Sequence, residues 1–458
     1  MARINRRFKK KRSPFPFFLI ITLLLAGAGG YAFVTYFEGE KPQITSMNLP
    51  AYVGNKTPVS FIVTDTKSGL RSIKIMAIQN GKEKKIFAKE YPRQEKNGTA
   101  GTTQEEIKVE LNAKALGLKE GEAVLRVEAI DYSLRGLLKG NSSTMFHTFN
   151  IDTKPPKVSI VHSEKYIEPG GSGIVIYRVD DQVKHGVMIN ETYHPGFPLN
   201  ESSDSKYIAY IALPYTALEI SKSVIIAEDA AGNRTVKPFA PVMKKAKQKK
   251  DRINIGDGFL SRKLPEFEEH YPEMEGNPVQ KYLYTNRKVR AMNNQKIHDL
   301  CMNPEQNKLW SGKFIRMAGS SKAGFADHRT YYYKGEAIDK QVHLGMDIAS
   351  TQHAKIKAAG TGKIIFCDYL GIYGNMVMID HGQGVVSLYS HLSQINVASG
   401  DSINQGDILG NSGTSGMAGG DHLHFSMLVN GIFVTPKEWW DQHWIDVTIA
   451  GPLADASF

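Results

Sequence analysis

The stretch "HLHFSMLVNGIFV", residues 422–434, places two imidazoles two positions apart in a strand-like pattern. Period-two alternation puts His422 and His424 on one face of a strand and leaves apolar side chains on the other face. The pair Asn430-Gly431, followed by more apolar residues, is a strong signal for a two-residue hairpin turn. We therefore predict a β-hairpin that carries both histidines near the rim of a sheet, where they could form a site.

Two more polar patterns follow the same strand logic in the C-terminal region. In "VHLGMDIAS", His343 and Asp347 are four residues apart, and Gly345 between them favours a strand that leaves room for an ion. In "VVSLYSHLS", His391 lies on the polar face of an alternating run. The candidates are therefore His343, Asp347, His391, His422 and His424.

These five side chains exceed the needs of one catalytic zinc ion. Such an ion takes three protein ligands from histidine and carboxylate and keeps one position open. Two imidazoles would be left over, one to accept a proton from water and one to stabilise a developing oxyanion. Spacing alone does not say which three residues bind the metal and which two remain.

Other features narrow the chemistry. The chain has 2 cysteines, Cys301 and Cys367, which excludes a cysteine-based zinc site. It has no HExxH motif, so the helical zinc-protease arrangement with a glutamate base is absent. His381, in "MIDHGQG", is interpreted as a structural residue at a strand end.

The formal charge of +11 comes from two short segments. Residues 3–12 carry seven basic side chains and no acid, and residues 244–252 carry six basic side chains and one acid, so the rest of the chain is close to neutral. Two local patches do not make an extended nucleic-acid footprint. We expect no nucleic-acid partner.

An uncharged, mostly apolar run from Pro14 to Phe37 follows the first basic patch. It is long enough to span a bilayer as a helix, which takes about 20 residues. Because the basic residues precede it, we predict a single-pass inner-membrane anchor with a cytoplasmic N-terminus and the body in the periplasm or cell-wall space. A cleaved signal peptide is the alternative, since Ala26–Gly30 offers small residues for cleavage.

The remainder of the chain is predicted to be mainly β. Two segments have short alternating runs separated by Gly, Asn and Asp turns, as in β-sandwiches, and "DTKPP" and "DAAGN" resemble bacterial immunoglobulin-like modules. A basic linker and a helical segment follow, with Asn277 as N-cap and Pro278 at the first helical position. The predicted parts are 1–40 (basic segment and transmembrane anchor), 41–152 and 153–242 (immunoglobulin-like sandwiches), 243–306 (linker and helices) and 307–458 (all-β domain).

The block that begins "HLGMDIAS" and ends "GGDHLHFSMLVNG" closely resembles the lysostaphin-type, or LytM-like, zinc endopeptidases that cut peptidoglycan cross-links. The resemblance covers about residues 310–440. It implies an all-β peptidase domain with a groove over an antiparallel sheet and one Zn²⁺ ion. It also implies that His343, Asp347 and His424 are the zinc ligands, and that His391 and His422 activate water and stabilise the tetrahedral intermediate.

Two positions near this block remain ambiguous. Tyr389 could donate to the substrate or the oxyanion, or it could pack in the core. In "GFADHRT", Ala326 follows Phe325 where the family usually has glycine, so the entrance of the groove departs from the family pattern.

The leading interpretation is a zinc metalloendopeptidase that hydrolyses peptide cross-links or stem peptides of peptidoglycan in cell-wall remodelling. The alternative is a non-catalytic envelope protein that binds or activates other wall hydrolases. All five site positions are filled, which favours the enzyme. The expected partners are peptidoglycan, the inner membrane through residues 14–37, and envelope proteins at the sandwich modules.

Overall fold

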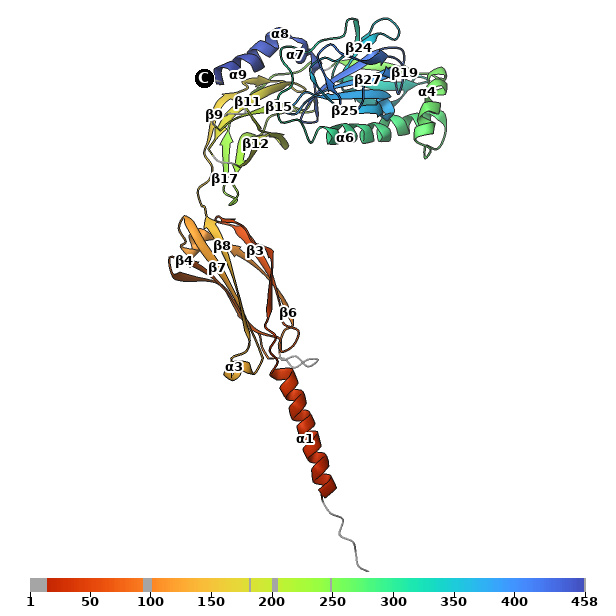
Figure 1. Cartoon of the computed structure of the whole chain (residues 1–458). Helices are drawn as coiled ribbons and strands as arrows, with labels where there is room; N and C mark the ends of the chain where they lie inside the picture. Colours follow the sequence, from red (N-terminus) through yellow and green to blue (C-terminus); the bar gives the residue numbers. More distant parts are fainter. Residues whose placement is uncertain (1–14, 94–100, 181–182, 200–204, 248, 457–458) are drawn as a thin grey trace, which may run out of the picture. The chain divides into compact units, whose positions relative to one another are not determined.

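The computed structural model divides into two compact units, Met1–Pro155 with Asp229–Asn233, and Pro156–Glu228 with Arg234–Phe458. The basic residues 3–12 lie outside the described part, so the predicted basic segment stays a prediction. The described residues, drawn in colour in Figure 1, are 15–93, 101–180, 183–199, 205–247 and 249–456.

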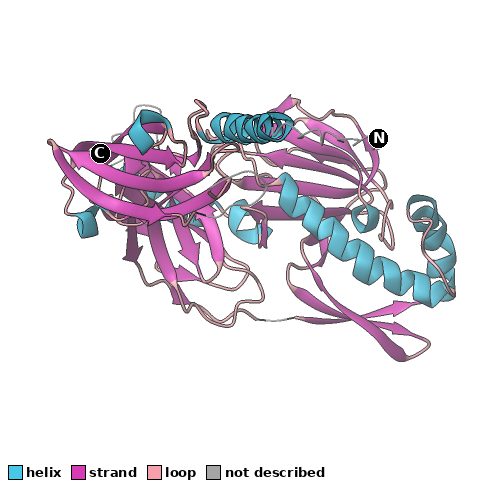
Figure 2. Cartoon of the chain, turned by 90° about the horizontal axis from the view of Figure 1, so that it is seen from below, coloured by secondary structure: helices cyan, strands magenta, loops and turns pink. Residues whose placement is uncertain are grey.

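Helix α1 (Phe15–Tyr36) forms within the apolar run. Its Ala26–Gly30 stretch consists of small residues that add little apolar surface. Among the residues that the structure describes, no helix is long and apolar enough to cross a membrane. This finding overturns the predicted transmembrane helix and, with it, the expected membrane contact through residues 14–37. The mainly β class itself is confirmed, since strands predominate in Figure 2.

The first unit contains a β-sandwich. One sheet has the order β1-β3-β6 and the other β2-β8-β7-β4-β5. Alternate residues of β3 and β7 point inward, and Phe61, Ile73 and Leu125 share one buried core. The elements are β1 (Gln43–Asn48), β2 (Tyr52–Val53), β3 (Thr57–Thr64), β4 (Leu70–Gln79), β5 (Lys82–Glu90), β6 (Gln104–Leu111), α2 (Ala113–Leu116), β7 (Gly121–Asp131), α3 (Arg135–Leu138) and β8 (Ser142–Ile151).

The second unit begins with another sandwich, with sheets β14-β15-β11-β9 and β13-β12-β16-β17 and a short pair β10-β18. Its strands are β9 (Val158–Ser163), β10 (Tyr166–Ile167), β11 (Ser172–Val179), β12 (Lys184–Ile189), β13 (Thr192–Pro195), β14 (Phe197–Pro198), β15 (Lys206–Ala212), β16 (Ser223–Glu228), β17 (Arg234–Pro238) and β18 (Val242–Met243). Strand β11 is buried on both faces. Val175 and Tyr177 face the core of the sandwich, whereas Ile174 and Ile176 join the core of the C-terminal domain.

This second sandwich is therefore packed firmly against the C-terminal domain within one unit. Tyr210 from β15 shares a core cluster with Trp310 and Trp439. Asn430, in the turn after the histidine pair, donates to the Tyr210 carbonyl at 2.8 Å. The predicted hairpin thus also contacts the sandwich.

A helical segment precedes the C-terminal strands, as predicted. Asn277 caps α5 through a full capping box with Gln280, and Pro278 occupies the first helical position. The elements are β19 (Lys250–Ile255), α4 (Asp257–His270), α5 (Pro278–Tyr284), the π-helix η1 (Thr285–Val289) and α6 (Arg290–Leu300). The helices bury Phe267 and Ile297 against Tyr373 and Met376 of the C-terminal domain.

The C-terminal domain is built on a large sheet of order β20-β23-β30-β27-β26-β25-β28, and a smaller sheet of order β19-β21-β22 lies beside it. The strands are β20 (Ser320–Ala323), β21 (Asp327–Tyr333), β22 (Glu336–His343), β23 (Met346–Ala349), β24 (Lys355–Lys357), β25 (Gly362–Tyr369), β26 (Asn375–Asp380), β27 (Val385–Ile395), β28 (Ser402–Ile403), β29 (Ile408–Ser412), β30 (Leu423–Val429) and β31 (Ile432–Val434). The helices are η2 (Gly371–Tyr373), α7 (Pro436–Trp440), α8 (Gln442–Trp444), η3 (Ile445–Ala450) and α9 (Gly451–Ala456).

The hairpin prediction is confirmed in its turn but not in its place within the sheet. Asn430 and Gly431 have φ of 51° and 78°, as a type I′ turn requires. However, β30 lies between β23 and β27 and is buried along its whole length. The strand is therefore central in the sheet, and packed elements cover both of its faces.

Glu438 of α7, at the contact between the sandwich and the C-terminal domain, is expected to make the stability of the protein depend on pH. Its Oε2 accepts from the backbone N and Oγ of Ser172, both at 2.9 Å. Burial raises the pKa of Glu438 to about 8, although both Ser172 hydrogen bonds act in the opposite direction. The folded protein then binds more protons than the unfolded chain between about pH 4.5 and 8, so stability falls as pH rises through this window.

We expect Glu438→Gln to flatten this dependence, since the amide oxygen still accepts from Ser172 but carries no charge. The difference from wild type should be on the order of a few kcal/mol in unfolding free energy at pH 8 and vanish near pH 4. Thermal unfolding across this range measures it, with the exposed Glu219→Gln as the matched control. A pH slope that persists in Glu438→Gln would contradict the assignment.

Candidate metal centre

Strand pairing, rather than helical spacing, brings the candidate residues together. His343 is the last residue of β22, and Asp347 is the second residue of β23, after a break at Leu344–Gly345. Asp347 lies directly opposite His424 in the antiparallel pair β23-β30. On the other side of β30, Ser390 is the partner of His424, which places the next residue, His391, beside the same point.

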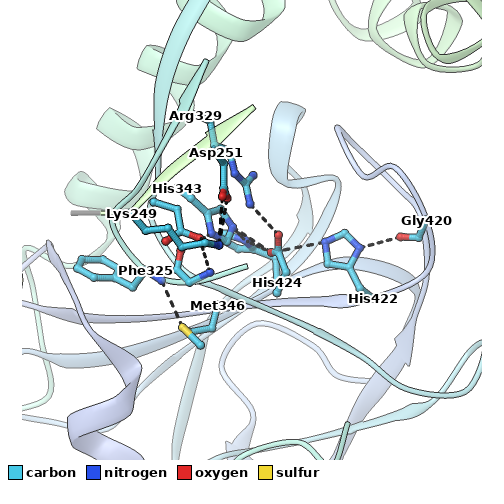
Figure 3. Close-up of polar contacts among 12 residues, drawn as sticks. Lys249, Asp251, Phe325, Arg329, His343, Met346, Gly420, His422 and His424 are labelled. Atoms are coloured by element: carbon cyan, nitrogen blue, oxygen red, sulfur yellow. Dashed lines mark hydrogen bonds and ion pairs between the residues drawn. The ribbon is translucent and has the colours of Figure 1, made fainter. Parts of the chain in front are cut away.

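Three side-chain atoms converge at this point. His343 Nε2 lies 2.9 Å from Asp347 Oδ1 and 2.9 Å from His424 Nδ1. His424 Nδ1 lies 2.9 Å from the same Asp347 oxygen. Figure 3 shows the rings of His343 and His424 turned toward each other and His422 approaching from the side. These contacts form a nearly equilateral triangle of nitrogen, nitrogen and oxygen.

Each ring makes one hydrogen bond on its outer side, and that bond leaves the inner nitrogen, the one in the triangle, without a proton. His343 Nδ1 lies 2.8 Å from the Gly324 carbonyl, which only accepts, so Nδ1 carries the hydrogen and Nε2 presents a lone pair. Ser426 Oγ donates to the Leu344 carbonyl and therefore accepts from His424 Nε2 at 3.1 Å. His424 Nδ1 then also presents a lone pair.

In these tautomers three acceptors face one another, an arrangement that a cation between them would stabilise. Ligand atoms about 2.0 Å from a tetrahedral zinc ion lie about 3.3 Å apart, which is close to the observed contacts. The ligand atoms of His343, Asp347 and His424 all lie within 4.8 Å of one another. The donor set of two imidazoles and one carboxylate fits a catalytic zinc ion.

The other two candidate histidines flank this triangle. His391 Nδ1 donates to the Ser415 carbonyl at 2.8 Å, so its Nε2 is free of hydrogen. His422 Nδ1 donates to the Gly420 carbonyl at 2.7 Å, and its Nε2 lies 3.5 Å from Asp347 Oδ1. The two rings are 4.9 Å apart between centroids. The structure thus brings together all five residues that the sequence singled out.

The surroundings favour the protonation states that a metal requires. Burial lowers the pKa of His424 to about 4. Burial, followed by the neighbouring His422 and His424, holds the pKa of His391 well below its usual value. Burial alone would raise the pKa of Asp347, but the charge and hydrogen bonds of the surrounding histidines hold it well below its usual value. At neutral pH His424 and His391 therefore offer unprotonated imidazoles, and Asp347 offers an ionised carboxylate.

Several contacts that shape the metal centre gave no signal in the sequence. Arg329 of β21 donates from Nη2 to Asp347 Oδ2 at 3.1 Å and so leaves the other carboxylate oxygen to the metal position. A Cβ at Gly345 would lie 2.6 Å from His424 Nε2 and from Ser426 Oγ. The glycine therefore makes room for His424, and not for an ion as we predicted. Both contacts join separate strands, so residue spacing could not reveal them.

Tyr389 and His381 belong to the core. Tyr389 is buried, and its hydroxyl accepts from the backbone N of Ala359 at 2.7 Å, which fits packing rather than substrate contact. His381 is fully buried, with Nδ1 on the Thr361 carbonyl and Nε2 on Ser387 Oγ, as its structural interpretation predicted.

A cavity of about 410 Å³ opens at the metal position. Its walls come from the C-terminal domain and also from the segment before it. Asp251, Asn254 and Phe259 of β19 and α4 line it together with the candidate residues. The helical segment is thus part of the site's surroundings.

A centre of two histidines and one aspartate, flanked by two more imidazoles in a cavity, is the arrangement that metal-dependent hydrolases use. Residues 341–436 match Peptidase family M23. The C-terminal domain of this chain is therefore an M23 domain, which confirms the resemblance drawn from its motifs.

The relatives match in the same region. DD-carboxypeptidase/endopeptidase Mpg of Neisseria meningitidis is 40% identical over 96 residues, 21% of this chain and 22% of that protein. Peptidoglycan DD-endopeptidase ShyC of Vibrio cholerae is 35% identical over 97 residues, 21% of this chain and 22% of that protein. Murein hydrolase activator EnvC of Escherichia coli is 31% identical over 111 residues, 24% of this chain and 26% of that protein. The chain thus spans about a quarter or less of the length of these curated relatives.

We predict that His343→Ala and His424→Ala retain less than about a tenth of the wild-type zinc, because each removes one corner of the ligand triangle. His422→Ala should keep most of its zinc. Elemental analysis of the purified full chain measures this, with His353→Ala as a control, since His353 lies outside the cluster. Zinc loss in His422→Ala with retention in His424→Ala would mean that the roles of the pair are reversed.

Ala326, the departure from the family pattern, has a left-handed backbone with φ of 59°. An L-residue there costs about 1–2 kcal/mol, partly offset because glycine is more flexible when unfolded. We expect Ala326→Gly to raise the free energy of unfolding by about 0.5–1 kcal/mol. Chemical denaturation measures it, with Ala323→Gly in strand β20 as a control that should be destabilised. An unchanged or lower stability for Ala326→Gly would contradict this account.

Proposed function

We propose that this chain is a zinc metalloendopeptidase that hydrolyses peptide cross-links or stem peptides of bacterial peptidoglycan. The observation that carries the proposal is the convergence of three lone pairs from His343, Asp347 and His424 beside two further imidazoles. The M23 match supports peptide hydrolysis, and the names of Mpg and ShyC support peptidoglycan as the substrate.

In this proposal His343, Asp347 and His424 hold one zinc ion per domain. Zinc, when bound, supplies a Lewis acid that activates water and polarises a peptide carbonyl. The Gly324 carbonyl and Ser426 Oγ fix the tautomers of the two ligand rings. Arg329 holds the second oxygen of Asp347, so that the carboxylate presents one oxygen to the centre.

His391 and His422 carry the proton chemistry in this proposal. His391 presents an unprotonated Nε2 because its Nδ1–H is bound to the Ser415 carbonyl, and it is placed to accept a proton from the attacking water. His422 lies across from it and is placed to stabilise the developing oxyanion.

The setting of the reaction is also part of the proposal. Its substrate lies outside the cytoplasm, so we place the action of the chain in the periplasm or cell-wall space. The sandwich modules would offer surfaces to envelope proteins. The name of the relative EnvC favours a second candidate, a non-catalytic activator of wall hydrolases. The filled set of five site residues favours the enzyme.

Digestion of purified sacculi by the zinc-loaded full chain separates these two functions. We expect loss of cross-linked muropeptide dimers, seen by mass spectrometry, and no loss with a chelator or in His424→Ala. The masses of the products name the bond. A zinc-loaded protein that binds sacculi without cutting them, but stimulates an added wall hydrolase, would establish the activator instead.

A further inference from the structure

His391 has a strained backbone. Its φ is 64°, in the left-handed region, although it lies inside strand β27. The pairing register of β27 is irregular around it: against β26 the register shifts between Tyr389 and Leu392, and against β29 it shifts between Leu392 and Gln394. Strain of this kind persists only where the surroundings hold the residue in place. The orientation of its ring therefore depends on its contacts.

The main polar contact of the ring is the carbonyl of Ser415, in the loop between β29 and β30. The side chain of Ser415 connects the same loop to the irregular part of β27 and to β26. Its Oγ donates to the Leu392 carbonyl at 2.8 Å and accepts from Asn375 N at 2.9 Å. The next residue, Gly416, has φ of 63°, and a Cβ there would lie 2.4 Å from Gly374 N. The loop thus fits closely against the sheet on one side.

On its other side the loop is held by helix α4. Glu266 Oε1 accepts from Gly416 N at 2.6 Å. Lys263, three residues earlier on the same face of α4, donates from Nζ to the Thr414 carbonyl. The two side chains lie 3.8 Å apart as an ion pair and are 13% and 27% exposed. Lys263 and Glu266 thus hydrogen-bond the two peptide groups that flank Ser415, through the Thr414 carbonyl and Gly416 N.

We propose that Lys263 and Glu266 are positioning residues for the hydrolysis, acting on His391 through the Ser415 carbonyl. This inference rests on the proposed function, in which His391 accepts a proton. Both residues lie outside the stretch 341–436 that matches the M23 family. A displaced Ser415 carbonyl frees the His391 ring to rotate its Nε2 away from the attacking water. An error of about 1 Å in such positioning costs on the order of 100-fold in rate.

The test compares Glu266→Ala and Lys263→Met with a matched control, Glu268→Ala. Glu268 is on the same helix, but it binds Lys281 Nζ at 2.7 Å and not the loop. With a soluble cross-linked muropeptide as substrate, we expect kcat to fall about 10- to 100-fold in both variants. KM, zinc content and melting temperature should stay at wild-type values. Glu266→Gln should recover most of kcat, because its amide oxygen still accepts from Gly416.

A second readout does not need cleavage. The Nδ1–H resonance of His391 in the zinc-loaded full chain should broaden or shift in Glu266→Ala and stay unchanged in Glu268→Ala. If wild type cleaves nothing but this resonance responds, the proposed function fails and the positioning contact stands. Wild-type kcat in Glu266→Ala, an unchanged resonance, or a rate loss matched by loss of zinc or of stability would each overturn the positioning role.

Discussion

Three unprotonated acceptor atoms that meet at 2.9 Å are the constraint on which the site depends. Such an arrangement is unfavourable without a cation, so the chain must hold the atoms together by other means. The antiparallel pairing of Asp347 with His424 fixes two of them, and the Gly324 carbonyl fixes the ring of His343. Asp347 lies on β23 and His424 on β30, whereas Gly324 lies in the turn between β20 and β21. The two sheets of the C-terminal domain therefore serve mainly to bring these strands into register.

The unit that supports this centre is larger than the stretch that matches the family. Tyr210 and other apolar side chains of the second sandwich pack in the same core as Trp439. Helix α4 lines the cavity and, through Glu266, hydrogen-bonds the loop that contacts His391. Within the second unit, the sandwich and the helical segment are thus packed parts of the peptidase domain rather than separate attachments.

Much of the site could be read from local patterns, because alternation and turn signals act between near neighbours. The Asn430-Gly431 turn, the strand that carries His424 and the Asn277 cap are of this kind. The apolar run at the N-terminus forms helix α1, but none of the described helices is long and apolar enough to cross a membrane, and the composition of the run did not reveal this. The position of β30 within its sheet was missed, because alternation shows which face is polar and not what covers that face.

The sequence by itself determined which chemical groups are present: four imidazoles and a carboxylate on strands of one domain, and a resemblance that assigned their roles. Only the tertiary structure decided how they meet. Tautomers depend on carbonyls such as those of Gly324 and Ser415, and the second oxygen of Asp347 depends on Arg329. These contacts join residues from separate strands and loops. No periodicity within one segment encodes them, since long-range hydrogen bonds form only when the strands have paired.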